Sequence, residues 1–226
     1  MVIEYLDETD STNEYLKRYL SSGEDRIVVA KRQTGGRGTK GRSFLSNEGG
    51  VYLSALTFYR DFPARDAFLI MARAAVAVCK TAEAFGLSPE IKWPNDVYLS
   101  GKKLAGILVE NSLDGDRVKS SIVGIGLNVC NDLRELKSIA VSLSEAAGRT
   151  IPCEKARELL VENLQNEVSF DDYLERVRFL GREVMVTERG ENYRAKAVKI
   201  CADGRLEIER EGVNILLSAA EISLKI

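Results

Sequence analysis

The chain has 226 residues, 45% apolar and 29% charged, a composition typical of a globular protein with one sizeable domain, or one domain and a small appendage. A formal net charge of -2 argues against a general nucleic-acid binder, which normally carries a strong basic excess. No run of about eighteen uncharged apolar residues occurs, so we expect no membrane span. The first residues lack the basic start and long apolar centre of a signal peptide, which favours a cytoplasmic location.

Histidine is absent, and this excludes Ser-His-Asp and Cys-His nucleophilic systems as well as the usual zinc sites. Catalysis would have to rely on Lys, Arg, Asp, Glu, Asn, backbone amides or an added metal. Cys79, Cys130, Cys153 and Cys201 are far apart in the sequence, and no pair has metal-ligand or redox spacing. We therefore expect the four cysteines to pack as small apolar residues.

The first sixty residues predict three short strands around one helix. The helix begins near Ser11, a candidate N-cap that forms a capping box with Glu14. A basic, glycine-rich segment over residues 31–43 follows the second strand. The strands are expected at residues 1–5, 27–30 and 51–58.

The middle of the chain alternates helical and strand patterns. Residues 66–85 have helical spacing, and Gly86 is a natural stop. Asp114 and Gly115 indicate a hairpin, and Pro152 lies near the start of a further helix. The expected strands are 90–93, 97–99, 103–111 and 120–129. After them we expect one helix that runs towards Val168 and another from Phe170 to about Phe179.

The pattern changes after residue 180. Four short strands separated by glycine-containing turns are expected at residues 182–187, 193–200, 206–209 and 213–217. Strands this short and closely spaced are typical of a small β-barrel. We therefore predict an α+β protein with a larger domain over residues 1–180 and a small β-domain over 181–226.

The segment from Lys31 to Arg42 holds five cations, four glycines and no acid. A flexible solvated loop is the ordinary interpretation of a charge run, but the glycine density favours close approach of backbone amides to an anion. Residues 36–43 nearly match a phosphate-binding P-loop, yet residues 44–50 cannot form the helix that a P-loop must open. The Gly-x-Gly at 124–126 lacks the third glycine of a dinucleotide site and is weak alone.

Lys103 lies at the start of an apolar strand, where burying an ammonium group requires an anionic partner. An exposed strand-end lysine is the ordinary interpretation. However, Asn95 and Asp96 lie just across the turn at residues 100–101, so their side-chain oxygens can approach the Lys103 ammonium group.

Ser11 and Thr12 could cap a helix and also present hydroxyl groups and amides to a small polar ligand.

Together these segments resemble the biotin–protein ligase family in the right order over residues 7–130. The signature Lys92-Trp93-Pro94-Asn95-Asp96 is followed by a matching strand at residues 103–108. The other matches are residues 11–13, the glycine-rich loop at 33–42 and the strand at 126–129. The resemblance implies a mixed-sheet, class II synthetase-like biotin–lipoate ligase catalytic domain and an SH3-like C-terminal barrel.

Two residues depart from the family pattern. Thr39 stands where the family loop usually has a second arginine, which helps to retain the reactive intermediate, so Lys40 or Arg42 would substitute for it. Phe44 replaces a common tryptophan beside the adenine and preserves stacking with less area. The chain also begins close to the first motif, which leaves no room for the DNA-binding domain of relatives that act as repressors.

The resemblance implies that biotin attacks the α-phosphate of Mg²⁺-bound ATP to form biotinyl-5'-AMP, and that an acceptor lysine then takes the biotinyl group. It assigns catalysis to Lys103, Asp96 and Arg37. The implied biotin-binding residues are Ser11, Thr12, Asn13, Gln33, Arg37, Gly38, Thr39, Lys103 and Gly106. The implied ATP-binding residues are Arg37, Lys40, Arg42, Phe44, Asn95, Lys103 and Asn128.

The implied partner is a biotin carboxyl carrier protein or domain of a biotin-dependent carboxylase or decarboxylase, with neither nucleic acid nor membrane involved. Homodimerisation through a sheet edge is common in the family. Three alternatives stay open: a lipoate- or octanoate-transferring enzyme, a biotin-sensing repressor and a binding module without activity. The acceptor protein, the oligomeric state and the role of the C-terminal domain are not determined by the sequence.

Overall fold

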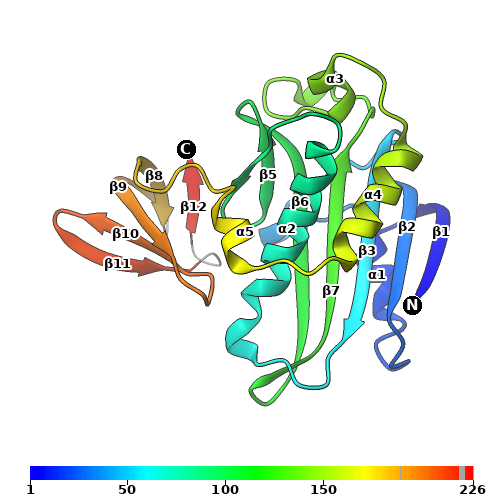
Figure 1. Ribbon diagram of the computed structural model, residues 1–226, viewed down its shortest axis with the longest axis horizontal. Helices are drawn as coiled ribbons and strands as arrows, with labels where there is room; N and C mark the ends of the chain where they lie inside the picture. Colours follow the sequence, from blue (N-terminus) through cyan, green and yellow to red (C-terminus); the bar gives the residue numbers. More distant parts are fainter. Residues whose placement is uncertain (189, 219–221, 226) are drawn as a thin grey trace.

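The computed structural model describes residues 1–188, 190–218 and 222–225, which form two β-sheets (Figure 1). The larger sheet has seven strands in the order β1-β2-β3-β7-β6-β5-β4. Only β1 and β2 pair in parallel, and the other neighbours are antiparallel, so the expected mixed sheet is confirmed. Its strands are β1 (Val2–Thr9), β2 (Arg26–Gln33), β3 (Gly50–Phe58), β4 (Glu90–Lys92), β5 (Asp96–Leu99), β6 (Lys102–Asp114) and β7 (Arg117–Asn128).

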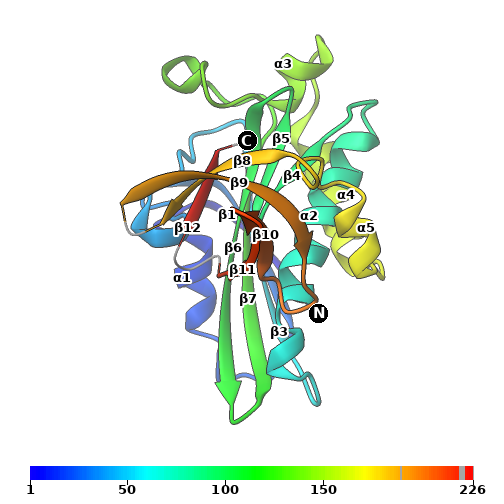
Figure 2. The same cartoon turned by 90° about the vertical axis from the view of Figure 1, so that its left-hand side faces the viewer.

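Helices cover both faces of this sheet (Figure 2). One face carries α2 (Phe68–Glu83), on which α4 (Cys153–Gln165) and α5 (Phe170–Leu174) pack, and α3 (Leu143–Ala147) lies at one end. The opposite face carries α1 (Thr12–Lys17), whose Leu16 packs with Val28, Leu56 and Ile122. Because residues 27–30 of β2 are buried on both faces, they form a continuous apolar run rather than an alternating one. Within the described ranges, no helix is long and apolar enough to cross a membrane.

Two local predictions about helices were wrong. Ser11 occupies the N-cap position of α1, as expected, but its side chain makes no capping hydrogen bond. The Ser11 amide donates to Asp10 Oδ1 at 2.7 Å rather than to Glu14, so the expected capping box does not form. The helix expected to run towards Val168 spans Cys153–Gln165. The helix expected over 170–179 ends at Leu174, because the following segment continues as a non-helical connection that buries Val177 and Phe179. Core burial there replaces helical hydrogen bonding.

The expectation for the cysteines was correct only in part. Cys79 is fully buried in the core, as a small apolar residue would be. Cys130 and Cys153, in contrast, are brought together by the fold, and their sulfur atoms lie 3.5 Å apart. Cys130 is exposed, so it does not fill an apolar site. Their spacing in the sequence did not predict this contact, because the two cysteines belong to different elements that only the fold brings together.

The second sheet is antiparallel and has the strand order β11-β10-β9-β8-β12. Its strands are β8 (Glu183–Glu188), β9 (Glu191–Ile200), β10 (Leu206–Arg210), β11 (Val213–Leu217) and β12 (Ile222–Lys225). The small C-terminal β-domain is thus confirmed, and β12 is an additional strand that the sequence did not predict. The proposed boundary near residue 180 remains a prediction.

The second sheet contacts the larger one through the turn before β10. The buried Trp93 Nε1 donates to the Gly204 carbonyl oxygen at 2.9 Å. Gly204 has φ +85°, and a Cβ atom there would overlap with the ring of Phe68 at the start of α2. The turn therefore requires glycine for both its backbone conformation and its close approach.

Replacing Gly204 with alanine should lower the melting temperature more than replacing Gly212 with alanine. Both glycines have positive φ, +85° and +78°, but an added Cβ meets Phe68 only at Gly204 and nothing within 4 Å at Gly212. Overpacking of about 1–3 kcal/mol would give Gly204→Ala an extra loss of roughly 2–12 °C in melting temperature. Thermal unfolding of both variants checks this. Equal melting temperatures would show that the contact with Phe68 does not add to the cost of the substitution at Gly204.

Candidate active site

A cavity of about 670 Å³ lies where the glycine-rich segment, the start of α1, the 92–96 segment and the strands β6 and β7 meet. All of the site residues predicted from the sequence line it, with the exception of Asn128. Asn128 is buried at the end of β7, and its side chain donates to the Val141 carbonyl at 3.4 Å and accepts from Asn131 at 3.1 Å. The proposed nucleotide contact of Asn128 is therefore not supported by its position.

The floor of the cavity is built from glycines. Gly106 on β6 pairs with Gly126 on β7, and Gly124 lies two residues before Gly126 on the same face. A Cβ atom at Gly126 would lie 2.5 Å from the Phe44 ring, and one at Gly106 would lie 3.1 Å from Lys103 Nζ. Each of these glycines therefore makes room for a side chain of the site that packs directly on the sheet. The Gly-x-Gly motif is a packing feature of this floor.

A buried polar cluster forms one wall of the cavity. Gln33 Oε1 accepts from the amide and the hydroxyl of Thr12, at 2.8 and 3.0 Å. Ser54 Oγ donates to Asn13 Oδ1 at 2.6 Å, and Asn13 Nδ2 donates to Glu110 at 2.7 Å. Thr12 and Asn13 are each 4% exposed. These groups are held in place before any ligand arrives, which reduces the entropy cost of binding a small polar molecule.

Ser54, Glu110 and Ser46 were not anticipated as parts of the site. Ser46 accepts from Gln33 Nε2 at 2.9 Å and so fixes the orientation of the Gln33 amide. Ser54 lies inside an apolar strand, and only the pairing of β3 with β7 brings it beneath α1. A serine within an otherwise apolar buried strand was the one signal in the sequence that could have identified it.

Lys103 and Asp96 form an ion pair at the cavity, with Lys103 Nζ 2.7 Å from Asp96 Oδ1. Within the described residues, the buried Asp96 Oδ1 accepts no hydrogen bond besides this ion pair, so it can accept a second donor. The Asn95 side chain is fixed by donation to the Ile107 carbonyl at 2.8 Å.

The glycine-rich segment closes on itself as a tight loop. Gly38 N donates to the Arg42 carbonyl at 2.7 Å, and a short 3-10 turn spans Thr39–Gly41. Lys40 has φ 58°, a strained conformation for a residue with a side chain, and such strain concentrates at functional sites. Burial and then the nearby Arg42 charge lower the pKa of Lys40. Cations are therefore held close together, which favours binding of a polyanion. The next element after the loop is the strand β3, not a helix. The segment is therefore not a P-loop, as the sequence predicted.

The loop is also tied to α1. Arg37 Nη1 lies 2.8 Å from Glu14 Oε1, and Glu14 Oε1 also lies 2.7 Å from Lys17 Nζ.

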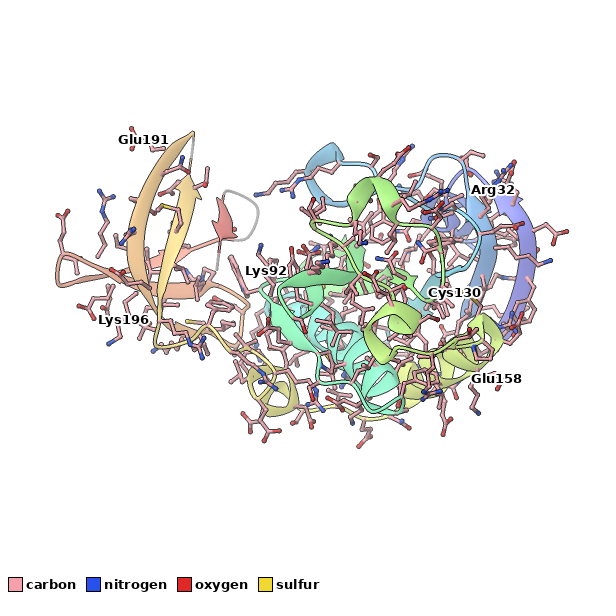
Figure 3. The ribbon with its side chains drawn as sticks, turned by 90° about the horizontal axis from the view of Figure 1, so that it is seen from above. Arg32, Lys92, Cys130, Glu158, Glu191 and Lys196 are labelled. Carbon is pink, nitrogen blue, oxygen red and sulfur yellow. The ribbon has the colours of Figure 1, made fainter. Side chains whose placement is uncertain are left out.

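Two further residues that were not predicted as site residues line the cavity on the side of the second sheet. Lys92 lies on the side of the main sheet that faces the second sheet (Figure 3). Asp203, from the turn that receives the Trp93 hydrogen bond, lines the cavity as well. The second sheet thus contributes one residue to the wall.

Comparison with known proteins identifies the relatives of this chain. The family model for the Biotin/lipoate A/B protein ligase family matches residues 5–128. The chain is 40% identical over 204 residues to the bifunctional ligase/repressor BirA of Bacillus subtilis, covering 85% of this chain and 62% of that protein. It therefore spans about three fifths of that curated relative. It is 29% identical to the biotin–[acetyl-CoA-carboxylase] ligase of Mycobacterium tuberculosis, covering 95% of this chain and 86% of that one.

A solved structure extends the likeness to the whole chain. The biotin protein ligase from Aquifex aeolicus in complex with biotin and ATP superposes with a TM-score of 0.76 at 31% identity. The match covers 99% of this chain and 98% of that structure. Both sheets are therefore part of a shared architecture. On the family match and this structural likeness, the chain belongs to the Biotin/lipoate A/B protein ligase family.

Proposed function

We propose that this chain is a biotin–protein ligase that activates biotin with ATP and transfers it to a lysine of a carrier protein. The observation that carries this proposal is the Lys103–Asp96 pair, which lies in the same cavity as the cationic loop and the polar cluster around Gln33. Relatives named for this activity support it, as does the Aquifex aeolicus ligase in complex with biotin and ATP. A cytoplasmic location and a homodimer remain predictions.

In the first half-reaction, the biotin carboxylate attacks the α-phosphate of ATP, and pyrophosphate leaves. The carboxylate is a weak nucleophile approaching a polyanion, so the work of the protein is alignment and charge neutralisation. Lys103 would contact both the carboxylate and the α-phosphate oxygens, and Arg37, Lys40 and Arg42 would hold the phosphates. Phe44, on the glycine floor, is our candidate for packing against the adenine.

Mg²⁺ fits this site as an ion carried by the ATP phosphates. The described residues contain no group of three or more His, Cys, Asp or Glu side chains that could hold a metal ion. Mg²⁺ at nucleotide sites commonly takes most of its ligands from phosphates and water, and it would supply charge neutralisation here. The biotin ring would bind at Ser11, Thr12, Asn13 and Gln33, whose donors and acceptors suit its ureido group.

In the second half-reaction, the acceptor lysine amine attacks the acyl carbon of biotinyl-5'-AMP, and AMP leaves. A lysine amine must lose protons to complete this attack, and Asp96 Oδ1 retains accepting capacity next to Lys103. The acceptor would be a biotin carboxyl carrier domain of a biotin-dependent carboxylase or decarboxylase.

Modification of a carrier domain tests the transfer step. The chain is incubated with ATP, Mg²⁺, a biotin carboxyl carrier domain and either biotin or lipoate, and the carrier is then weighed by mass spectrometry. The proposal expects the biotinyl mass on one carrier lysine and no lipoyl product. A lipoyl product alone would assign the chain to the lipoate branch of its family.

Thr39 is expected to make the enzyme release its intermediate faster than an arginine-containing variant. The hydroxyl cannot supply the charge-assisted hydrogen bonds of a guanidinium group, which are worth about 1.5–3 kcal/mol. Biotinyl-5'-AMP should therefore dissociate roughly 10-fold faster from the wild type than from Thr39→Arg. Off-rates measured by displacement check this, with Thr39→Ala as the uncharged control. Equal off-rates for wild type and Thr39→Arg would refute it.

A further inference from the structure

The fold brings two cysteines of different elements into contact, away from the cavity. Cys130 follows β7, Cys153 is the first residue of α4, and they are 23 positions apart. Their Sγ atoms lie 3.5 Å apart. Cys130 is exposed and Cys153 is partly buried. In Figure 3, Cys130 lies farther from the second sheet than Lys92 does, and neither cysteine lines the cavity.

The backbone of Gly49 contacts both cysteines of this pair. The Gly49 carbonyl oxygen accepts from the Cys130 amide at 2.7 Å and from Cys153 Sγ at 3.2 Å. Gly49 has φ +96°, and a Cβ atom there would lie 2.7 Å from the Asn131 amide nitrogen. The residues on either side of the thiols are thus packed closely around one glycine. The two thiols are thus held within reach of each other.

We propose that Cys130 and Cys153 are an oxidisable thiol pair, a site at which a reversible disulfide forms. A disulfide places its sulfur atoms about 2.0 Å apart, so the two sulfurs must approach by roughly 1.5 Å. Side-chain rotation of the exposed Cys130 can supply most of this displacement. The oxidant would be a peroxide or a small-molecule disulfide.

The difference in exposure sets the order of the reaction. With hydrogen peroxide, the Cys130 thiolate attacks one peroxide oxygen, the O–O bond breaks, and the departing hydroxide is protonated to water. The Cys153 sulfur then attacks the sulfur of the Cys130 sulfenic acid, and the S–O bond breaks. A second water leaves with the proton of the Cys153 thiol. Two thiols are oxidised to one disulfide and one peroxide is reduced to two waters.

Burial, and next the contact with Cys130, raise the pKa of the Cys153 thiol to about 12. Cys153 is therefore protonated at neutral pH, which leaves the exposed Cys130 as the thiol that meets the oxidant first. Cys201 is the matched comparison, because it is also partly buried but no described sulfur contacts it.

The disulfide would tie the loop that follows β7 to the first turn of α4. Cross-linking residues 23 positions apart restricts the unfolded chain, so the oxidised protein should melt at a temperature higher by on the order of 5 °C. A reducing dithiol should reverse the shift. This inference does not depend on the ligase activity.

Thiol counting and peptide mapping of the full-length chain test the pair. After treatment with a modest excess of hydrogen peroxide, we expect the loss of two thiols per chain from the four free cysteines. We also expect a cross-linked peptide containing Cys130 and Cys153, lighter by two hydrogens than its parts, and the higher melting temperature. Dithiothreitol should restore all three readouts.

Two variants complete the test. Cys201→Ser should behave as the wild type does, whereas Cys153→Ser should lose the cross-link and the temperature shift and leave Cys130 as a sulfenic or more oxidised acid. A wild-type protein in which Cys130 is overoxidised without a cross-link would overturn the proposal. Cross-links that join Cys130 to Cys201 or to a second chain would overturn it as well.

Discussion

Replacing Lys103 with alanine should lower biotin-dependent exchange of pyrophosphate into ATP by at least about 100-fold. Loss of one donor that stabilises developing charge typically costs this much or more in rate. Lys103 Nζ lies at the cavity, 2.7 Å from Asp96 Oδ1 and 5.8 Å from the centre of the Phe44 ring. An alanine side chain has neither a charge nor a donor with which to bridge a carboxylate and a phosphate. The readout is the initial rate of exchange at saturating biotin and ATP.

The matched control is Lys102→Ala, because Lys102 is the adjacent residue and does not line the cavity. It should retain wild-type exchange. Removing Lys103 also leaves the Asp96 carboxylate without its partner, which costs about 1–3 kcal/mol of stability if unrelieved. The double variant Lys103→Ala/Asp96→Asn removes that charge, so it should regain stability in urea without regaining activity. Exchange by Lys103→Ala at the wild-type rate would remove Lys103 from the mechanism.

Replacing Gly124 with alanine should disrupt the biotin side of the cavity. The new Cβ atom would overlap with Asn13 Oδ1, which cannot turn away without losing the hydrogen bond from Ser54. Displacing Asn13 also breaks its donation to Glu110. We expect a loss of about 1–3 kcal/mol in the free energy of unfolding and at least roughly 10-fold weaker biotin binding.

Urea unfolding and calorimetric titration with biotin measure the two effects. A second substitution separates steric overlap from other causes. In the Asn13→Ala background the side chain that overlaps is gone, so Gly124→Ala should cost clearly less stability than in the wild type. Equal costs in both backgrounds would show that Asn13 is not what the glycine accommodates.

The sequence predicted the parts of the site that are local in the chain. The cations and glycines of residues 31–43 lie on one loop, and Asp96 and Lys103 are separated by one turn, so their proximity follows from chain geometry. Each strand of the main sheet was also predictable, because apolar runs bounded by glycine or proline are a short-range signal. These features place nearly all of the predicted residues in one cavity.

Two kinds of contact were not predictable from the sequence. They are contacts that depend on the order of strands in the sheet, and hydrogen bonds for which neighbouring side chains compete. Ser54 reaches Asn13 only because β3 pairs with β7 beneath α1. The Ser11 capping box failed because the preceding Asp10 carboxylate took the amide that Glu14 would have bound. Cys130 and Cys153 meet because the end of β7 and the start of α4 converge on Gly49. No pattern along the chain encodes these outcomes.

The C-terminal sheet has both features that the sequence predicted and contacts that it did not. Turn glycines marked four of its strands, whereas the docking of Gly204 on Trp93 and Phe68 required the folded arrangement. That docking makes Trp93 of the signature a structural anchor for the second sheet. The signature therefore combines an anchor, Trp93, with the residues that we propose for chemistry, Asp96 and, beyond the turn, Lys103.

Exchange of labelled pyrophosphate into ATP by the purified wild-type chain tests the central claim most directly. Formation of an acyl-adenylate is reversible, so a ligase returns label to ATP only when its own acid is present. We expect rapid exchange with biotin and Mg²⁺, and only background exchange with lipoate, with octanoate or without an acid. Exchange that lipoate supports and biotin does not, or no exchange with any of these acids, would contradict it.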